Sequence, residues 1–227
     1  MDVFGENWNN HAQKIERNWQ DSVAEEDLVL IAGDISWAMK ADEAQKDLEW
    51  IADLPGYKLL LKGNHDYWWS SQKKMQSLLP VSVSCLSNNA FDFFEVSIAG
   101  SRLWDSQEYS FDNYIQWRGD KKATKTYTEE DSKIFERELQ RLEMSLEALN
   151  KESKLRIVMT HYPPISATLE DSRVSKLLEK YSVDICVFGH LHNIKSQSLD
   201  FGEKNGVRYV LSSCDYIDFK PIKILEF

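Results

Sequence analysis

Aspartate, asparagine and histidine gather in four short segments of this sequence, and His11 is the only one of the five histidines outside them. The segments are Gly33-Asp34, Gly63-Asn64-His65-Asp66, His161-Tyr162-Pro163-Pro164 and Gly189-His190-Leu191-His192. Each directly follows a short apolar run that is typical of a buried strand. Asp, Asn and His side chains delivered from several strand ends are the ligand types of a divalent metal with mixed oxygen and nitrogen coordination.

Taken one at a time, these segments have simpler explanations. Asp34 alone could cap a helix, and His161 alone could be a hydrogen-bonded histidine at a strand end. The run 64–66 is a stronger signal, because a turn tolerates Asn and Asp but has no need of a histidine between them. His190 and His192 are one residue apart and point to different sides of an extended loop, which suits two metals or one ligand and one orienting group. Four such strand ends in one chain favour a common site.

The order Gly-Asp, Gly-Asn-His-Asp, a lone His and Gly-His-x-His resembles that of the calcineurin-like metallophosphoesterases. The resemblance runs along most of the chain. It implies a dinuclear metal centre in which Asp34 bridges both ions. Asn64, His161 and His190 would complete one site, and His192 would belong to the other. The metals would be divalent, and manganese, iron, zinc and nickel all accept such ligands.

The same resemblance gives catalytic roles to His65 and Asp66. His65 would protonate the leaving oxygen, and Asp66 would orient its ring. An imidazole whose pKa lies near neutrality can deliver such a proton, and a hydrogen-bonded carboxylate fixes its tautomer. Two cations about 3.5–4 Å apart lower the pKa of a shared water and stabilise the charge of a transferring phosphoryl group. The implied activity is the metal-dependent hydrolysis of phosphomonoesters or phosphodiesters.

One part of the family pattern is missing, because no Asp-x-His occurs in the sequence. In the family this motif ends the first strand and ligates the first metal. A misplaced start, a trimmed chain and a real loss are the three explanations, and the first two are favoured because losing an interior strand leaves backbone groups unpaired. We expect weak or absent turnover from this chain. The alternative function is a non-catalytic protein of the same fold that binds a metal or a phosphate ligand, and a third reading is a relic without metal.

Apolar runs and helical spacing predict the elements that position these residues. We expect strands over 28–32, 57–61, 155–160, 183–188, 207–212 and 222–227, with the last two paired through a turn. We expect helices over 7–24, 41–52, 70–79 and 172–181, and a long one that Thr128 caps with Asp131 reaching back. The resemblance implies an α/β fold, a four-layer α-β-β-α sandwich of two mixed sheets that lacks the first strand.

The segment 101–127 has many aromatic residues but no clean periodicity, and it predicts an irregular excursion near the site. Together with Trp68 and Trp69 it could form a lid or wall at the site. A second small hydrophobic cluster beneath a long loop explains the same residues equally well.

Composition limits the other functions. We expect one domain over residues 1–227, with a formal charge of −10 that argues against long nucleic acid and anionic lipid as partners. A small phosphate ester is still acceptable, because bound metals supply positive charge locally. The apolar runs are too short for a membrane span. Three widely spaced cysteines and no export signal predict a reduced, cytoplasmic protein, while the oligomeric state is open.

Overall fold

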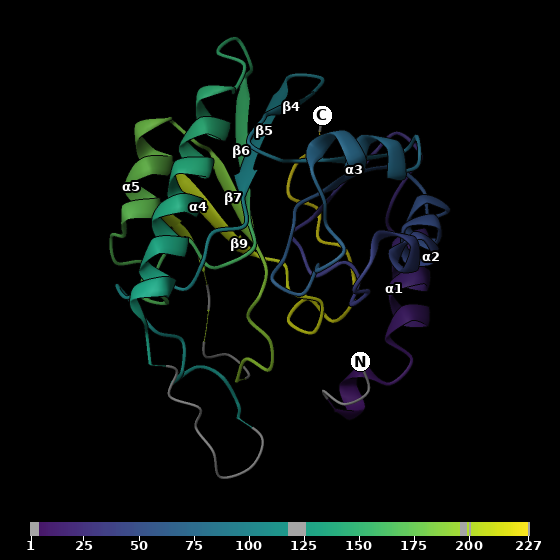
Figure 1. The fold of residues 1–227 in the computed structure, drawn as a ribbon, viewed down its shortest axis with the longest axis horizontal. Helices are drawn as coiled ribbons and strands as arrows, with labels where there is room; N and C mark the ends of the chain where they lie inside the picture. Colours follow the sequence, from purple (N-terminus) through teal and green to yellow (C-terminus); the bar gives the residue numbers. More distant parts are fainter. Residues whose placement is uncertain (1–4, 118–125, 196–198, 200, 227) are drawn as a thin grey trace.

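The structure is a computed structural model of the chain, and it describes residues 5–117, 126–195, 199 and 201–226. Two sheets pack face to face, and helices cover the outer face of each sheet (Figure 1). This arrangement is the expected four-layer α-β-β-α sandwich, so the fold predicted from the sequence is confirmed.

The smaller sheet contains three parallel strands: β1 (Leu28–Ile31), β2 (Tyr57–Leu60) and β3 (Val83–Cys85). The larger sheet has the strand order β4-β5-β6-β7-β9-β8. Its strands are β4 (Phe91–Phe93), β5 (Val96–Ser101), β6 (Leu155–Thr160), β7 (Ile185–Phe188), β8 (Glu203–Lys204) and β9 (Val207–Leu211). The strands β5, β6, β7 and β9 are parallel, so their carboxyl ends lie at the same edge of the sheet.

The helices match the predicted ones closely. They are the short 3-10 helix η2 (Glu6–Trp8), α1 (His11–Gln20), α2 (Ala41–Ala52), α3 (Gln72–Leu78), α4 (Glu129–Glu147) and α5 (Arg173–Lys180). The predicted cap of α4 is confirmed, since Thr128 and Asp131 form a reciprocal capping box. Among the residues that the structure describes, no helix is long and apolar enough to cross a membrane.

Three hydrophobic clusters hold the layers together. The inner cluster lies between the two sheets and includes Leu59, Ile157 and Val187. A second cluster joins α4 and α5 to the outer face of the larger sheet, and a third joins α2 and α3 to the smaller sheet. Burial on both faces explains why β7 is apolar along its whole length and why the other central strands are largely apolar.

Two details differ from the sequence-based expectation. Every described pair in the smaller sheet is parallel, so only the larger sheet is mixed; helical connections bring successive strands back in the same direction. The predicted strand over 222–227 is wrong within the described part of the segment, which has no regular structure. β9 already pairs with β7 and β8, so neither of its edges is open to a further strand.

Candidate metal site

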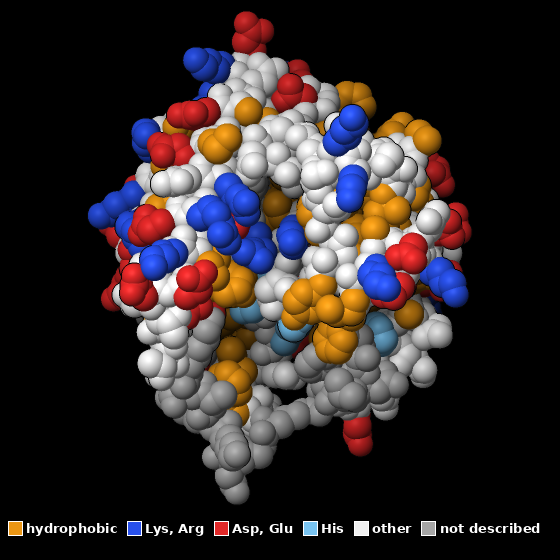
Figure 2. All heavy atoms as spheres, viewed as in Figure 1, with side chains coloured by type: hydrophobic (Ala, Val, Ile, Leu, Met, Phe, Trp, Pro, Cys, Tyr) orange, Lys and Arg blue, Asp and Glu red, His pale blue; other side chains and the backbone are white. Residues whose placement is uncertain are grey.

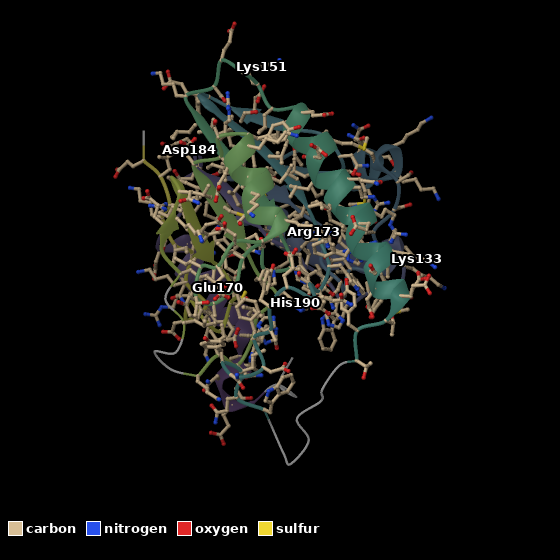
Figure 3. The ribbon with its side chains drawn as sticks, turned by 90° about the vertical axis from the view of Figure 1, so that its left-hand side faces the viewer. Lys133, Lys151, Glu170, Arg173, Asp184 and His190 are labelled. Atoms are coloured by element: carbon tan, nitrogen blue, oxygen red, sulfur yellow. The ribbon has the colours of Figure 1, made fainter. Side chains whose placement is uncertain are left out.

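Four of the predicted ligands lie together at the carboxyl ends of the strands. Asp34 follows β1, Asn64 follows β2, His161 follows β6 and His190 follows β7. Figure 3 shows His190 at the end of the sandwich where α5 begins at Arg173, away from the end marked by Lys151 and Asp184. Two sheets thus contribute side chains to one place.

Short distances connect these four side chains. Oδ1 of Asn64 lies 2.7 Å from Nε2 of His161 and 3.0 Å from Nδ1 of His190. The two ring nitrogens are 3.2 Å apart, and Oδ2 of Asp34 lies 3.6 Å from Nε2 of His161. Donor atoms bound at about 2.1 Å to one cation lie roughly 3 Å from each other. The donor set therefore fits one divalent metal ion.

The hydrogen bond behind His161 fixes which atom faces this group. Nδ1 of His161 donates to the carbonyl oxygen of Ala32 at 2.8 Å, because a carbonyl can only accept. Nε2 then presents its lone pair to the amide oxygen of Asn64. Burial lowers the pKa of His161 to about 3, so the ring is neutral and supplies no proton to this contact. Acceptor atoms that converge in this way have the arrangement that the ligands of a bound cation adopt.

Burial also keeps the ring of His190 neutral. Its pKa is lowered, first by burial and then by the adjacent His161. A neutral imidazole is the form that binds a metal. Among the described residues, no group of three or more His, Cys, Asp or Glu side chains is by itself spaced to hold a metal ion. The convergence depends on the amide oxygen of Asn64, which lies within hydrogen-bonding distance of both rings.

Backbone geometry at the site leaves room for nothing larger than glycine at two positions. A Cβ on Gly63 would lie 2.1 Å from Oδ1 of Asp34, and a Cβ on Gly33 would lie 2.6 Å from Nδ1 of His161. Asp34 and His190 have positive φ angles of 57° and 68°. Such a conformation is uncommon for a residue with a side chain and is concentrated at functional sites.

Asp66 ties the two loops of the smaller sheet together. Its carboxylate accepts backbone N–H bonds from Gly63, Asp34, Ile35 and Ser36 at 2.7–3.1 Å. The indole of Trp68 donates a fifth bond to the same carboxylate. Asp66 thus fixes the loop that carries Asp34, and its expected role as the group that orients His65 stays a prediction.

His65 lies at the margin of the site. Its backbone N–H donates to Oδ1 of Asp34 at 2.9 Å, which orients that carboxylate. Its ring lies 5.5 Å from the ring of Trp37 and 6.2 Å from that of Tyr67, both of which are exposed. The expected role of His65 as a proton donor stays a prediction.

His192 makes contacts with a different set of residues. Its Nδ1 lies 2.6 Å from Oδ1 of Asp215, and its ring packs against that of Trp8 at 5.5 Å. Burial, the largest single effect, raises the pKa of Asp215, but the hydrogen bond and charge of His192 and the backbone hydrogen bonds together outweigh it, so the pKa of Asp215 is lowered. Asp215 also accepts a bond from the backbone of Asn193.

The aromatic segment packs beside the site in its described part, residues 101–117. The ring of Trp104 contacts Tyr162, and Tyr162 lies 4.1 Å from the ring of His190. Tyr109 donates to the carbonyl of Pro163. These rings belong to the main hydrophobic cluster, whereas Trp68 is buried in the cluster of the smaller sheet. Residues 118–125 of the predicted excursion lie outside the described residues.

Comparisons with known proteins agree with this arrangement. The sequence matches the calcineurin-like phosphoesterase family over residues 5–193, which is most of the chain. No protein with a curated function matches it. A solved structure described as "GAP50 the anchor in the inner membrane complex of Plasmodium" has a TM-score of 0.52 and 13% identity, over 93% of this chain and 68% of that chain. That likeness shows the fold alone. The family match shows that this chain belongs to the calcineurin-like phosphoesterases.

Proposed function

We propose that this protein is a metal-dependent hydrolase of phosphate esters whose first metal is held by Asp34, Asn64, His161 and His190. The contact between the lone pairs of His161 and Asn64 supports this proposal most directly. A bound divalent metal would supply a nucleophile at neutral pH and positive charge for the phosphoryl oxygens. Membership of the family supports phosphoester hydrolysis in general.

The residues of this chain have separate tasks in the proposal. The carbonyl of Ala32 keeps His161 in the tautomer that binds metal, and the backbone of His65 keeps Asp34 turned toward the site. The ring of His65 holds the proton that the leaving oxygen needs. His192 would contribute to a second metal ion, with Asp215 fixing its ring. Manganese, iron, zinc and nickel all accept these ligands, and Mn²⁺ is the test metal.

The charge and the cysteines of the protein bear on its substrate and its location. Small phosphate monoesters or diesters fit an acidic protein better than long nucleic acid does. We also propose a cytoplasmic location. Cys85, Cys186 and Cys214 are free thiols, as expected in a reducing compartment.

A second candidate function is binding of a metal or phosphate ligand without turnover. It is favoured by one observation: the donors of the first metal converge on one place, whereas no Asp-x-His occurs in the sequence to complete the second. Binding and hydrolysis must therefore be measured separately.

The test combines Mn²⁺ binding by calorimetry with hydrolysis of 4-nitrophenyl phosphate and bis(4-nitrophenyl) phosphate. We expect His190→Ala to abolish both, while His11→Ala, a matched histidine outside the site, leaves both unchanged. Metal binding without hydrolysis of either ester would decide for the second candidate. Absence of Mn²⁺ binding by the unaltered protein would overturn the hydrolase and the metal-binding form of the second candidate.

A further inference from the structure

A group of basic side chains lies next to the candidate metal site. Figure 2 shows Lys and Arg side chains gathered near the middle of one face, beside a hollow and above the pale blue histidines. Four basic residues, Lys62, Arg102, Arg137 and Arg141, are related to one another by their interactions with Glu138. Because the protein as a whole carries a formal charge of −10, such a concentration of positive charge is unexpected.

Three of the four cations surround one buried carboxylate. Oε1 of Glu138 lies 2.6 Å from Arg141, 3.3 Å from Arg102 and 3.8 Å from Arg137. Lys62 interacts electrostatically with Arg102, Glu138 and Arg141, and also with Asp66. Glu138 alone is shared among three arginines, and an anion binding beside them would relieve their mutual repulsion.

Two of the cations are built into the loops of the site. Lys62 directly precedes the Gly63-Asn64 segment, and the carbonyl of Arg102 accepts the backbone N–H groups of His161 and Tyr162. The guanidinium of Arg102 also lies 4.8 Å from the ring of Trp104. Its side chain is only 17% exposed, so it is held in place before any ligand arrives.

The other two cations are open to a ligand. The side chains of Arg137 and Arg141, both on α4, are 54% and 46% exposed. Guanidinium groups bind phosphate through paired hydrogen bonds, which favours phosphate over a single-point anion. The cluster therefore combines fixed and adaptable donors.

We propose that Lys62, Arg102, Arg137 and Arg141 form a subsite for a second phosphate group of the substrate. This inference rests on the proposed function and narrows its substrate class to small molecules that carry two or more phosphates. The phosphate to be cleaved lies at the metal ligands, and the second phosphate lies between the loop after β5 and α4.

The test uses inorganic pyrophosphate as the probe and calorimetry in the presence of EDTA, so that metal binding plays no part. We expect the double variant Arg137→Gln/Arg141→Gln to bind pyrophosphate about ten-fold more weakly than the unaltered protein. The matched control is Lys151→Gln/Lys154→Gln, which removes the same charge. Figure 3 shows that Lys151 lies at the other end of the molecule from His190.

A third variant gives an effect of the opposite sign. Glu138→Gln removes the carboxylate that competes for the arginines, so we expect about three-fold tighter binding of pyrophosphate. Thermal unfolding of each variant checks that it is folded. Equal binding by the arginine variant and its control, or weaker binding by Glu138→Gln, would overturn the subsite. Binding as predicted in a protein that hydrolyses no ester would keep the subsite and reject the hydrolase.

Discussion

The candidate site contains two histidine groups that are held in different ways. The first group is His161 with Asp34, Asn64 and His190, and the second is His192 with Asp215. His161 is buried, and its Nδ1 is bonded to a main-chain carbonyl in the first loop. His192 has a side chain that is 34% exposed, and its Nδ1 is bonded to the carboxylate of Asp215, which is 10% exposed. The first ring is fixed by the packing of two sheets, whereas the second depends on one pair of side chains.

The two rings also differ in the kind of partner that fixes them, and this difference affects how each contributes to metal binding. A ring bonded to a carbonyl keeps one tautomer as long as the fold persists, because the carbonyl cannot donate. A ring bonded to a carboxylate keeps its orientation through charge, which solvent weakens in proportion to exposure. We therefore expect changes at the first group to cost more than changes at the second.

The largest effect is expected from Gly63→Ala. A Cβ at this position would lie 2.1 Å from Oδ1 of Asp34 and 2.2 Å from its backbone nitrogen, and backbone atoms cannot move aside cheaply. We expect the free energy of unfolding to fall by about 3 kcal/mol in chemical denaturation and Mn²⁺ binding to be lost.

Gly202→Ala is the control for this substitution, because an added Cβ there meets nothing within 4 Å. Its free energy of unfolding should change by no more than about 0.5 kcal/mol. A Gly63→Ala protein as stable as this control would show that the loops of the first group adapt, and the comparison would fail.

The next effect separates the two groups by their affinity for metal. We expect His161→Ala to weaken Mn²⁺ binding at least about 100-fold and His192→Ala to weaken it about ten-fold or less. Losing His161 removes a donor that faces Asn64 and lies close to Asp34. Calorimetric titration of both variants measures the difference, and the reverse order of affinities would contradict it.

Local patterns in the sequence predicted most of the helices and strands that position the first group. The helix at 41–52, the strand at 155–160 and the Thr128–Asp131 cap match the structure, because each is encoded by residues a few positions apart. Pairing of parallel strands places Asp34 and Asn64 at one edge of the smaller sheet, and His161 and His190 at one edge of the larger sheet. The packing of the two sheets then brings these edges together, and the family resemblance, not strand pairing, predicted that step.

Contacts between distant loops left no comparable signal. His192 and Asp215 are 23 residues apart and belong to no shared repeat or periodic element. Asp66 was expected beside His65, yet its carboxylate is occupied by four backbone N–H groups of two loops and by Trp68. The grouping of the basic residues around Glu138 depends on how α4 lies against β5, which spacing alone does not specify.

The smallest effect is expected from Asp215→Asn. Asparagine keeps an oxygen that can accept from His192, but it removes the charge that strengthens the bond and replaces the oxygen that accepts from Asn193 with a donor. Because the ring of His192 is one-third exposed, we expect thermal unfolding to report a loss of only about 1 kcal/mol. Asp218→Asn is the matched control, since its side chain is exposed and its φ of 52° is tolerated by asparagine. If Asp215→Asn destabilised the protein as much as Gly63→Ala, the pair would have to be part of the rigid core, and the two histidine groups would no longer differ in kind.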